Sequence, residues 1–167
     1  MAPQLLFDIA GLDLDSVVFD AHAIEKVNPH RGAMRLLDAV VHLSEDQSRL
    51  VAYHDVRDDE FWVTGHIPGQ PIFPGVMMIE TAAQLASFCY LRRTPGEGFM
   101  AFVGLDDVKF RGQVVPGDRF YVLCQEIDFR RRRCICHAQG LVNGQIVFEA
   151  VITGMPVAVN PAEAGKQ

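Results

Sequence analysis

One apolar helical segment, residues 77–90, constrains the fold of this chain more than any other stretch. Apolar side chains cover nearly every side of the expected helix, which begins after Pro74 and Gly75 and ends near Pro95 and Gly96. A helix that is apolar on all sides is buried in a protein core or in a membrane. This segment is shorter than the roughly 20 residues that span a bilayer. The sequence therefore predicts one buried helix at the centre of a globular fold.

The rest of the chain is dominated by strand patterns. After the helix the hydrophobic period changes to two, and Asn143-Gly144 between two alternating runs is typical of a tight β-hairpin. The helix and about six mostly antiparallel strands indicate an α+β domain in which a curved sheet wraps the helix. The expected strands are residues 36–43, 49–55, 100–110, 118–129, 134–142 and 145–155.

The length and composition favour a single globular domain. The 167 residues suffice for one sizeable core. We expect an N-terminal extension over residues 1–20, packed on the surface or partly mobile, then the folded domain over residues 21–157. The polar, small-residue tail, residues 158–167, is expected to be flexible.

Charge and cysteine content narrow the function. The formal net charge of −6 argues against nucleic-acid binding, which needs a basic face. The four cysteines form no CxxC pair and have no metal-ligand spacing, so we expect no metal site and reduced thiols. The N-terminus has no basic region of a secretory signal and no apolar run spans a membrane, so we expect a cytoplasmic protein.

A histidine and a carboxylate are the candidates for chemistry. His66 lies in a loop stiffened by Pro68 and Pro71, and Glu80 is the one acid on the apolar helix. Burying an unpaired carboxylate is costly, and desolvation would raise its pKa. The structural alternatives are a loop histidine that caps backbone groups and a salt-bridged acid.

Residues 65–84 resemble a family signature. The stretch G-H-I-P-G-Q-P-I-F-P-G-V-M-M-I-E-T-A-A-Q is similar to the H-F-P-G-x-P-x-x-P-G-V-x-x-x-E-x-x-A-Q motif of the 3-hydroxyacyl-[acyl carrier protein] dehydratases, which have the hotdog fold. Residues 29–38 and 104–118 are similar to two further family segments, and the resemblance spans residues 22–155. Two departures are Ile67, where the family has Phe, and residues 32–35, which include the charged Arg35.

The resemblance implies a hydro-lyase that needs no metal and no nucleotide. His66 would be the base that takes the C2 proton, and Glu80 the acid that protonates the departing hydroxyl. The amide of Gly75, at the positive end of the helix dipole, would hold the thioester oxygen; the alternative is a glycine needed for close packing. Gln84, one turn beyond Glu80, would orient the acid or satisfy a neighbouring backbone group.

Partners also follow from the resemblance. It implies a homodimer whose active sites use residues of both chains, and further a trimer of dimers, with acyl carrier protein bringing the substrate. The candidate tunnel residues are Phe73, Ile67 and Phe102. The basic run Arg130, Arg131, Arg132 and Arg133 is either a docking site for the acidic carrier or a solvated turn. His30 and Arg31 are expected to be structural.

Three other functions share this fold. A dehydratase/isomerase typically has Asp at the position of Glu80 and Cys at the position of Val76, so these two residues favour the plain dehydratase. A hotdog thioesterase would not need the H-x-P-G loop. A non-catalytic acyl-binding module remains an alternative because of the altered residues 32–35.

Overall fold

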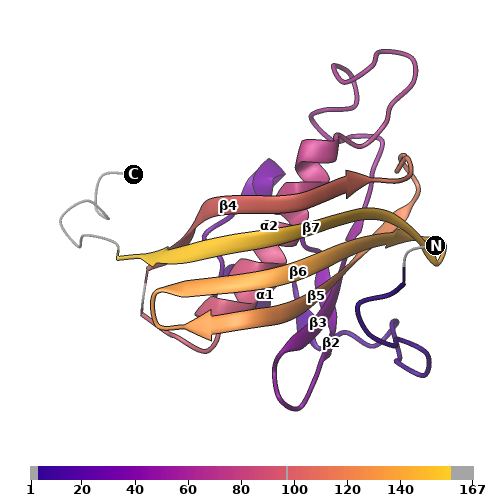
Figure 1. The fold of residues 1–167 in the computed structure, drawn as a ribbon. Helices are drawn as coiled ribbons and strands as arrows, with labels where there is room; N and C mark the ends of the chain where they lie inside the picture. The colour runs from indigo at the N-terminus through magenta and orange to yellow at the C-terminus, as the bar shows by residue number, and fades with distance from the viewer. Residues whose placement is uncertain (1–3, 97, 159–167) are drawn as a thin grey trace.

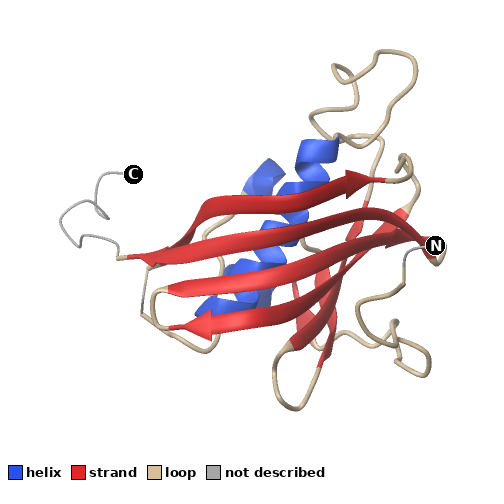
Figure 2. Cartoon of the chain, viewed as in Figure 1, coloured by secondary structure: helices blue, strands red, loops and turns tan. Residues whose placement is uncertain are grey.

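The fold is a curved antiparallel sheet wrapped around one long helix (Figure 1). The computed structural model describes residues 4–96 and 98–158. Figure 2 shows both helices on the same side of the sheet. Seven strands form the sheet in the order β1 (Phe19–Asp20), β2 (Ala39–Leu43), β3 (Arg49–Asp55), β5 (Arg119–Arg130), β6 (Arg133–Val142), β7 (Gln145–Val157) and β4 (Phe99–Phe110). The helices are α1 (Ala21–Glu25) and α2 (Gly75–Leu91).

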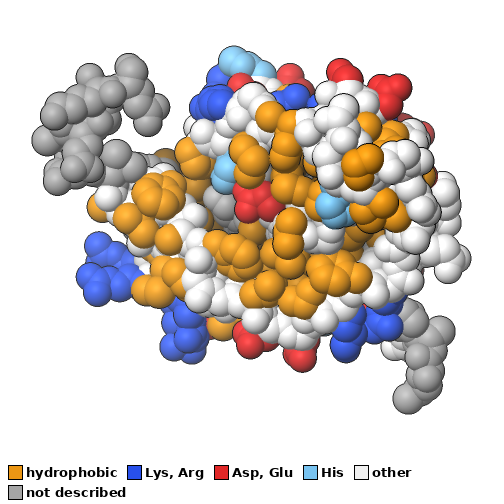
Figure 3. Space-filling view, turned by 90° about the horizontal axis from the view of Figure 1, so that it is seen from above, with side chains coloured by type: hydrophobic (Ala, Val, Ile, Leu, Met, Phe, Trp, Pro, Cys, Tyr) orange, Lys and Arg blue, Asp and Glu red, His pale blue; other side chains and the backbone are white. Residues whose placement is uncertain are grey.

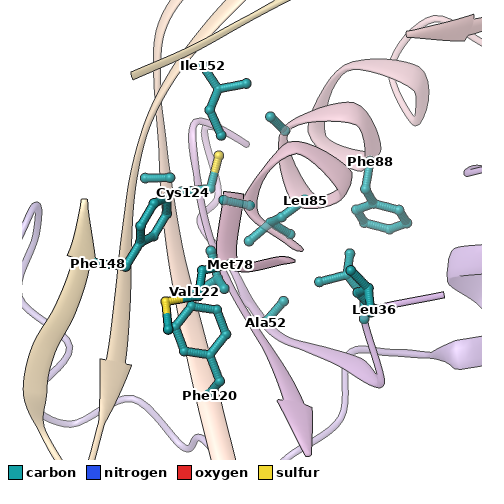
Figure 4. Close-up of a cluster of buried hydrophobic side chains, with 14 of the residues drawn as sticks. Leu36, Ala52, Met78, Leu85, Phe88, Phe120, Val122, Cys124, Phe148 and Ile152 are labelled. Atoms are coloured by element: carbon teal, nitrogen blue, oxygen red, sulfur yellow. The ribbon is translucent and has the colours of Figure 1, made fainter. Parts of the chain in front are cut away.

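Helix α2 is the predicted central helix. It starts two residues before the expected segment and ends one residue after it. Leu85 and Phe88 are 0% exposed, as expected for a helix that is apolar on most sides. Figure 4 shows Leu85 and Met78 pointing toward Phe120 and Phe148 of the sheet. The helix and the concave face of the sheet therefore form one core. Each fully buried side chain of this kind contributes about 1.5–3 kcal/mol to the stability of the fold.

The predicted hairpin between β6 and β7 is confirmed. Asn143 and Gly144 both adopt positive φ, 50° and 75°, which is the backbone of a type I′ turn. The two strands then pair in register from Val142↔Gln145 to Cys134↔Gly154. This turn places β6 and β7 side by side.

The sequence prediction is wrong for the start of the strand expected at residues 36–43. Leu36 and Leu37 are buried, but β2 begins only at Ala39. The amide of Leu36 donates to the side-chain Oε1 of Gln84 at 3.0 Å, so it is not available to a β-ladder. The sequence reasoning also missed α1, whose N-cap Asp20 accepts a hydrogen bond from the amide of Ala23 at 2.8 Å.

The N-terminal segment packs on the outer face of the sheet. Phe7 is 7% exposed and contacts a second hydrophobic cluster that contains Val51 and Leu123. The amide of Leu6 donates to Gln139 Oε1 at 2.9 Å. At the other end of the chain, the tail predicted to be flexible lies outside the described residues from 159 onward. No helix in the described ranges is long and apolar enough to cross a membrane.

Candidate active site

The loop before α2 fixes the imidazole of His66. The backbone amide of His66 donates to Trp62 O at 2.7 Å, and Nδ1 lies 2.7 Å from the carbonyl oxygen of Ile72. Because a carbonyl oxygen only accepts, Nδ1 carries the hydrogen and the lone pair is on Nε2. The loop therefore holds His66 in the tautomer that a general base requires.

Ile67, next to His66, adopts a conformation that is rare for its residue type. Its φ is 59°, in the left-handed region, and its side chain is 47% exposed. A β-branched residue at positive φ is strained, at a cost of about 1–3 kcal/mol. The family departure at this position therefore places a strained residue directly beside the candidate base.

Glu80 is held from its own helix. Its Oε1 accepts a hydrogen bond from Gln84 Nε2 at 2.8 Å and lies 3.4 Å from His30 Nε2. The Glu80 side chain is 26% exposed in the single chain, so it is less buried than the helix pattern indicated. Gln84 is itself fixed, because its Oε1 accepts from Leu36 and its Nε2 also donates to Met34 O at 2.8 Å.

His30 lies at the candidate site, although we expected only a structural role for it from the sequence. It contacts Glu80, and its Nδ1 is buried with no hydrogen-bond partner in the described ranges. Burial lowers the pKa of His30 below its ordinary value, against the opposing charge of Glu80. The imidazole is therefore neutral near pH 7 and can donate from Nε2 to Glu80. The one sequence signal was its place in the family-like segment 29–38.

Glu80 and His30 line a pocket between α2 and the edge of the sheet. The pocket has a cavity volume of about 50 Å³, more than the roughly 10–15 Å³ that one water molecule needs. Its walls are largely apolar. It is lined by His30, Glu80, Ala83, Gln84, Ala86, Ser87, Met100, Ala101, Phe102, Cys134, Ile152 and Gly154.

The predicted tunnel residues are not brought together. Phe102 lines the pocket beside Glu80. Phe73 is 1% exposed and packs in the core against Trp62 and Phe120, with ring centroids 5.5 and 5.9 Å away. Ile67 is exposed on the loop, and neither it nor Phe73 lines the pocket.

His66 and Glu80 do not meet within one chain. In the described part of the chain no hydrogen bond or ion pair joins them, and His66 does not line the pocket that contains Glu80. Each group has its own partners, namely Ile72 and Gln84. A single chain therefore presents two separate halves of the candidate site.

Gly75 has a packing role and a free amide. A Cβ at this position would lie 2.8 Å from the ring of Phe110. Pro74, the N-cap, gives no side-chain hydrogen bond, and the Gly75 amide has no acceptor in the described ranges. Unpaired amides at a helix N-terminus attract anionic oxygens. The geometry is thus compatible with both interpretations of this glycine.

The arginine run divides into two pairs. Arg130 and Arg133 bind Asp128 at 3.0 and 2.6 Å. Arg131 and Arg132, at the tip of the β5–β6 hairpin, form no ion pair with the residues that the structure describes. The hydroxyl of Tyr90 donates to Arg131 O at 2.6 Å, so this tip lies at the C-terminal end of α2. At 1.5 Å per residue, that end is roughly 22 Å from Gly75.

The edge strand β4 exposes hydrophobic side chains beside the site. β4 ends the strand order of the sheet, so it has one unpaired edge. Hydrophobic side chains gather across the face seen in Figure 3, with acidic and histidine side chains among them. A long apolar edge of this kind is usually covered by a partner. The exposed apolar residues of β4 and the start of α2 are Val76, Phe99, Phe102, Val103, Leu105 and Phe110.

The cysteines are all free and buried. Cys134 and Cys136 share one face of β6, with their sulfur atoms 3.5 Å apart. Within residues 4–96 and 98–158, no three His, Cys, Asp or Glu side chains are grouped so that they could hold a metal ion.

Comparison with known proteins decides the family. The model of the FabA-like domain matches residues 28–151. The chain belongs to the FabA-like family. It is 37% identical over 139 residues to the 3-hydroxyacyl-[acyl-carrier-protein] dehydratase FabZ of Saccharophagus degradans, which covers 81% of this chain and 95% of the relative.

Two further matches are a longer curated relative and a solved structure. The bifunctional enzyme LpxC/FabZ of Chlorobaculum tepidum is 35% identical over 136 residues, which cover 80% of this chain but 29% of that longer protein. Among solved structures, the dehydratase heterocomplex ApeI:P from Xenorhabdus doucetiae matches with a TM-score of 0.68 at 16% identity, covering 84% of this chain and 93% of that chain. The structural match shows that the fold is the hotdog fold predicted from the sequence.

Proposed function

We propose that this protein is a hydro-lyase that removes water from 3-hydroxyacyl thioesters bound to acyl carrier protein and releases trans-2-enoyl thioesters for fatty-acid synthesis. The FabZ relatives support this reaction. The observation that carries the proposal is the 2.7 Å contact between His66 Nδ1 and Ile72 O, because it leaves Nε2 free to accept a proton.

The proposed chemistry transfers two protons. His66 Nε2 takes the proton from C2 of the substrate. Glu80, in its protonated form, gives its proton to the C3 hydroxyl, and the C3–O bond breaks as water leaves. The amide of Gly75 takes no part in the proton transfers. It donates a hydrogen bond to the thioester oxygen as negative charge develops there.

Gln84 supports the acid by occupying one of its oxygens. Gln84 Nε2 donates to Glu80 Oε1 at 2.8 Å, and an oxygen that accepts this bond is the poorer place for a proton. The proton of the acid form is then carried by Oε2, which we expect to face the C3 hydroxyl. Because Leu36 and Met34 fix Gln84, the orientation of Glu80 is set before substrate binds.

The separation of His66 from Glu80 supports a shared active site. We propose that a second copy of the chain pairs along β4, so that His66 of one protomer faces Glu80 of the partner subunit. This arrangement would cover the exposed apolar side chains of β4, such as Phe102 at 47% and Val103 at 52%. A trimer of such dimers is the larger assembly that the family resemblance implies.

Carrier docking is assigned to the free arginines of the β5–β6 hairpin. Arg131 and Arg132 are the members of the run that Asp128 does not neutralise. A local cationic patch on a chain of net charge −6 would steer an acidic carrier. We place the reaction in the cytoplasm, where free thiols such as those of Cys134 and Cys136 persist.

A product assay tests the reaction. The purified protein is incubated with a 3-hydroxyacyl thioester on acyl carrier protein, and in parallel on CoA, and the products are followed by mass spectrometry. A 2-enoyl thioester is expected. Free acid would instead indicate a thioesterase, a 3-enoyl product a dehydratase/isomerase, and unchanged substrate at saturating concentration an acyl-binding module.

The carrier assignment is tested in the same assay. Arg131→Glu combined with Arg132→Glu is expected to raise KM for the carrier-bound substrate and leave KM for the CoA thioester unchanged, because only the carrier would contact the patch. Equal KM values for the variant and the wild type on the carrier would show that the hairpin is a solvated turn.

A further inference from the structure

A buried imidazole that the proposed reaction does not use lies beneath the catalytic loop. His54 of β3 is 1% exposed. Its Nδ1 lies 3.2 Å from Asp38 Oδ2, and its Nε2 lies 3.0 Å from Glu60 Oε1. Since both ring nitrogens face carboxylate acceptors, both donate only when the imidazole is protonated. We call these three side chains the His54 clamp.

The two carboxylates of the clamp are held by further donors. Asp38 Oδ2 accepts from the amide of Asp55 at 2.8 Å. Glu60 Oε1 accepts from the amide of Arg57 at 2.8 Å, and Glu60 Oε2 accepts from the indole Nε1 of Trp62 at 3.0 Å. Glu60 thus connects the buried histidine to the only tryptophan of the chain.

Trp62 in turn holds the backbone of the catalytic loop. Trp62 O accepts from the amides of Gly65 and His66 at 3.1 and 2.7 Å. At the far end of the loop, the ring of Phe73 lies 5.5 Å from both His54 and Trp62. The segment that carries His66 is therefore connected to the clamp at both ends, through Trp62 at one end and Phe73 at the other.

We propose that His54 is a positioning residue for His66, and that the protonated imidazole holds the catalytic loop through Glu60 and Trp62. The inference rests on the proposed function for its kinetic consequence. When His54 loses its proton, one carboxylate loses its donor and faces a lone pair instead. The negative charges of Glu60 and Asp38 are then no longer balanced by a cation between them. The loop that positions His66 Nε2 becomes less ordered as a result.

The charges around His54 place this change at mildly alkaline pH. Burial opposes the charged imidazole, but the hydrogen bonds to Asp38 and Glu60 prevail and raise its pKa from 6.5 to about 8. The same contact with His54 helps to lower the pKa of both carboxyl groups. The clamp is therefore complete below pH 6.5 and is lost as the pH rises through about 8.

The other charged groups near the clamp are two arginines and one paired carboxylate. Arg35 lies 3.3 Å from Asp38, and Arg57 lies 3.9 Å from it. Asp55, the next residue on β3, is paired with Arg119 of β5 at 2.6 Å. Arginines stay charged at all these pH values. His54 is thus the group of the cluster whose charge changes between pH 6.5 and 9.

Three variants and three readouts test the proposal. His54→Lys keeps a cation of ordinary pKa near 10.4 between the carboxylates, His54→Gln removes the charge, and His22→Gln changes an exposed histidine on α1 as the control. Each protein is titrated from pH 6 to 9.5. The readouts are Trp62 fluorescence, the NMR signals of the His66 imidazole, and kcat with KM for the 3-hydroxyacyl thioester.

In the wild type and in His22→Gln, we expect Trp62 fluorescence and the His66 signals to change with a midpoint near pH 8. We also expect kcat to fall about tenfold by pH 9 with little change in KM, because a misplaced catalytic group lowers the rate and not substrate binding. His54→Lys should remove the transition in all three readouts. His54→Gln should show the high-pH behaviour throughout.

The outcomes separate this inference from the proposed function. Wild-type fluorescence and His66 signals that stay constant across pH 8, or a His54→Gln protein with wild-type kcat and signals, would overturn the clamp. A clamp transition that His54→Lys removes, in a protein without dehydratase turnover at any pH, would refute the proposed reaction while the positioning of His66 by His54 stands.

Discussion

His66 and Glu80 are held in place in opposite ways. His66 sits on a loop, and its ring is fixed by a backbone carbonyl, that of Ile72 at 2.7 Å. Glu80 sits on a rigid helix, and its carboxylate is fixed by a side chain, that of Gln84 at 2.8 Å. The loop selects a tautomer, whereas the helix selects which carboxylate oxygen is occupied.

The difference shows that each half of the site is preformed without the other. The base depends on the conformation of residues 62–73, which other groups must support, and the acid depends on one network centred on Gln84. Since the two halves do not touch in the described part of one chain, assembly with a second copy would complete the site without reorganising either half. Changes to the loop and to the helix should therefore have separable effects.

The largest expected effect is the loss of either reacting group. His66→Ala and Glu80→Gln should each lower kcat by about 10²–10⁴-fold with little change in KM, as expected for general base and general acid groups. Steady-state kinetics on a 3-hydroxyacyl thioester measures this, with circular dichroism to show that the variants are folded. If both variants keep wild-type kcat, the assignment of base and acid is wrong.

The second effect is a pH-dependent loss of stability that comes from His54, which supports the loop and not the helix. His54 has a pKa of about 8 in the folded protein against 6.5 ordinarily, so its protonation stabilises the fold below pH 6.5, and this contribution is lost as the pH rises through 8. The free energy of unfolding should fall by about 2 kcal/mol over that range. Urea denaturation at pH 6, 7.5 and 9 measures it. An equal fall in His54→Lys would contradict this source of the pH dependence.

A smaller effect is expected at the support of the acid. Gln84→Ala removes the donor 2.8 Å from Glu80 Oε1 and leaves the 3.4 Å contact with His30. It should lower kcat about tenfold, because the acid remains but loses its orientation. The variant should leave the pH-dependent fluorescence of Trp62 unchanged, since the loop network does not include Gln84. A shift of that fluorescence transition in Gln84→Ala would show that the two halves are coupled within one chain.

The smallest effect concerns strain beside the base. Ile67→Gly removes a β-branched residue from φ 59° and should raise the free energy of unfolding by about 0.5–1 kcal/mol. Val18→Gly, at a similarly exposed site without positive φ, should lower it by about the same amount and serves as the control. Chemical denaturation of the two variants measures the difference. Destabilisation of similar size in both would mean that Ile67 is not strained.

Much of the fold was predictable because its patterns are local. The alternation of β6 and β7 and the Asn143-Gly144 turn depend on neighbouring residues, and the apolar helix required no knowledge of its partners. The strand start at Leu36 was not predictable, because its amide is bound by the side chain of Gln84, 48 residues away. Hydrophobic residues alone do not show where a backbone amide donates.

Among the supports of the candidate site, Gln84 was predictable from its spacing to Glu80, whereas the groups that hold His66 were not. The motif pointed to His66 and Glu80 as neighbours along the sequence, and their family roles remain predictions. His54 carried no signal, and His30 carried only its place in the family-like segment 29–38, because their partners come from other elements. Phe73, inside the motif, was predicted to line the tunnel but packs in the core against Trp62. Spacing identifies reactive groups, whereas three-dimensional packing determines what holds them.

The shared active site is tested most directly by mixing two inactive chains. His66→Ala and Glu80→Gln chains, carrying different tags, are co-expressed, and dimers that contain both are purified by both tags. One of the two sites then combines the intact His66 of the second chain with the intact Glu80 of the first. The account predicts about half of wild-type kcat per dimer. Activity of the mixed dimer no higher than that of either variant alone would contradict it.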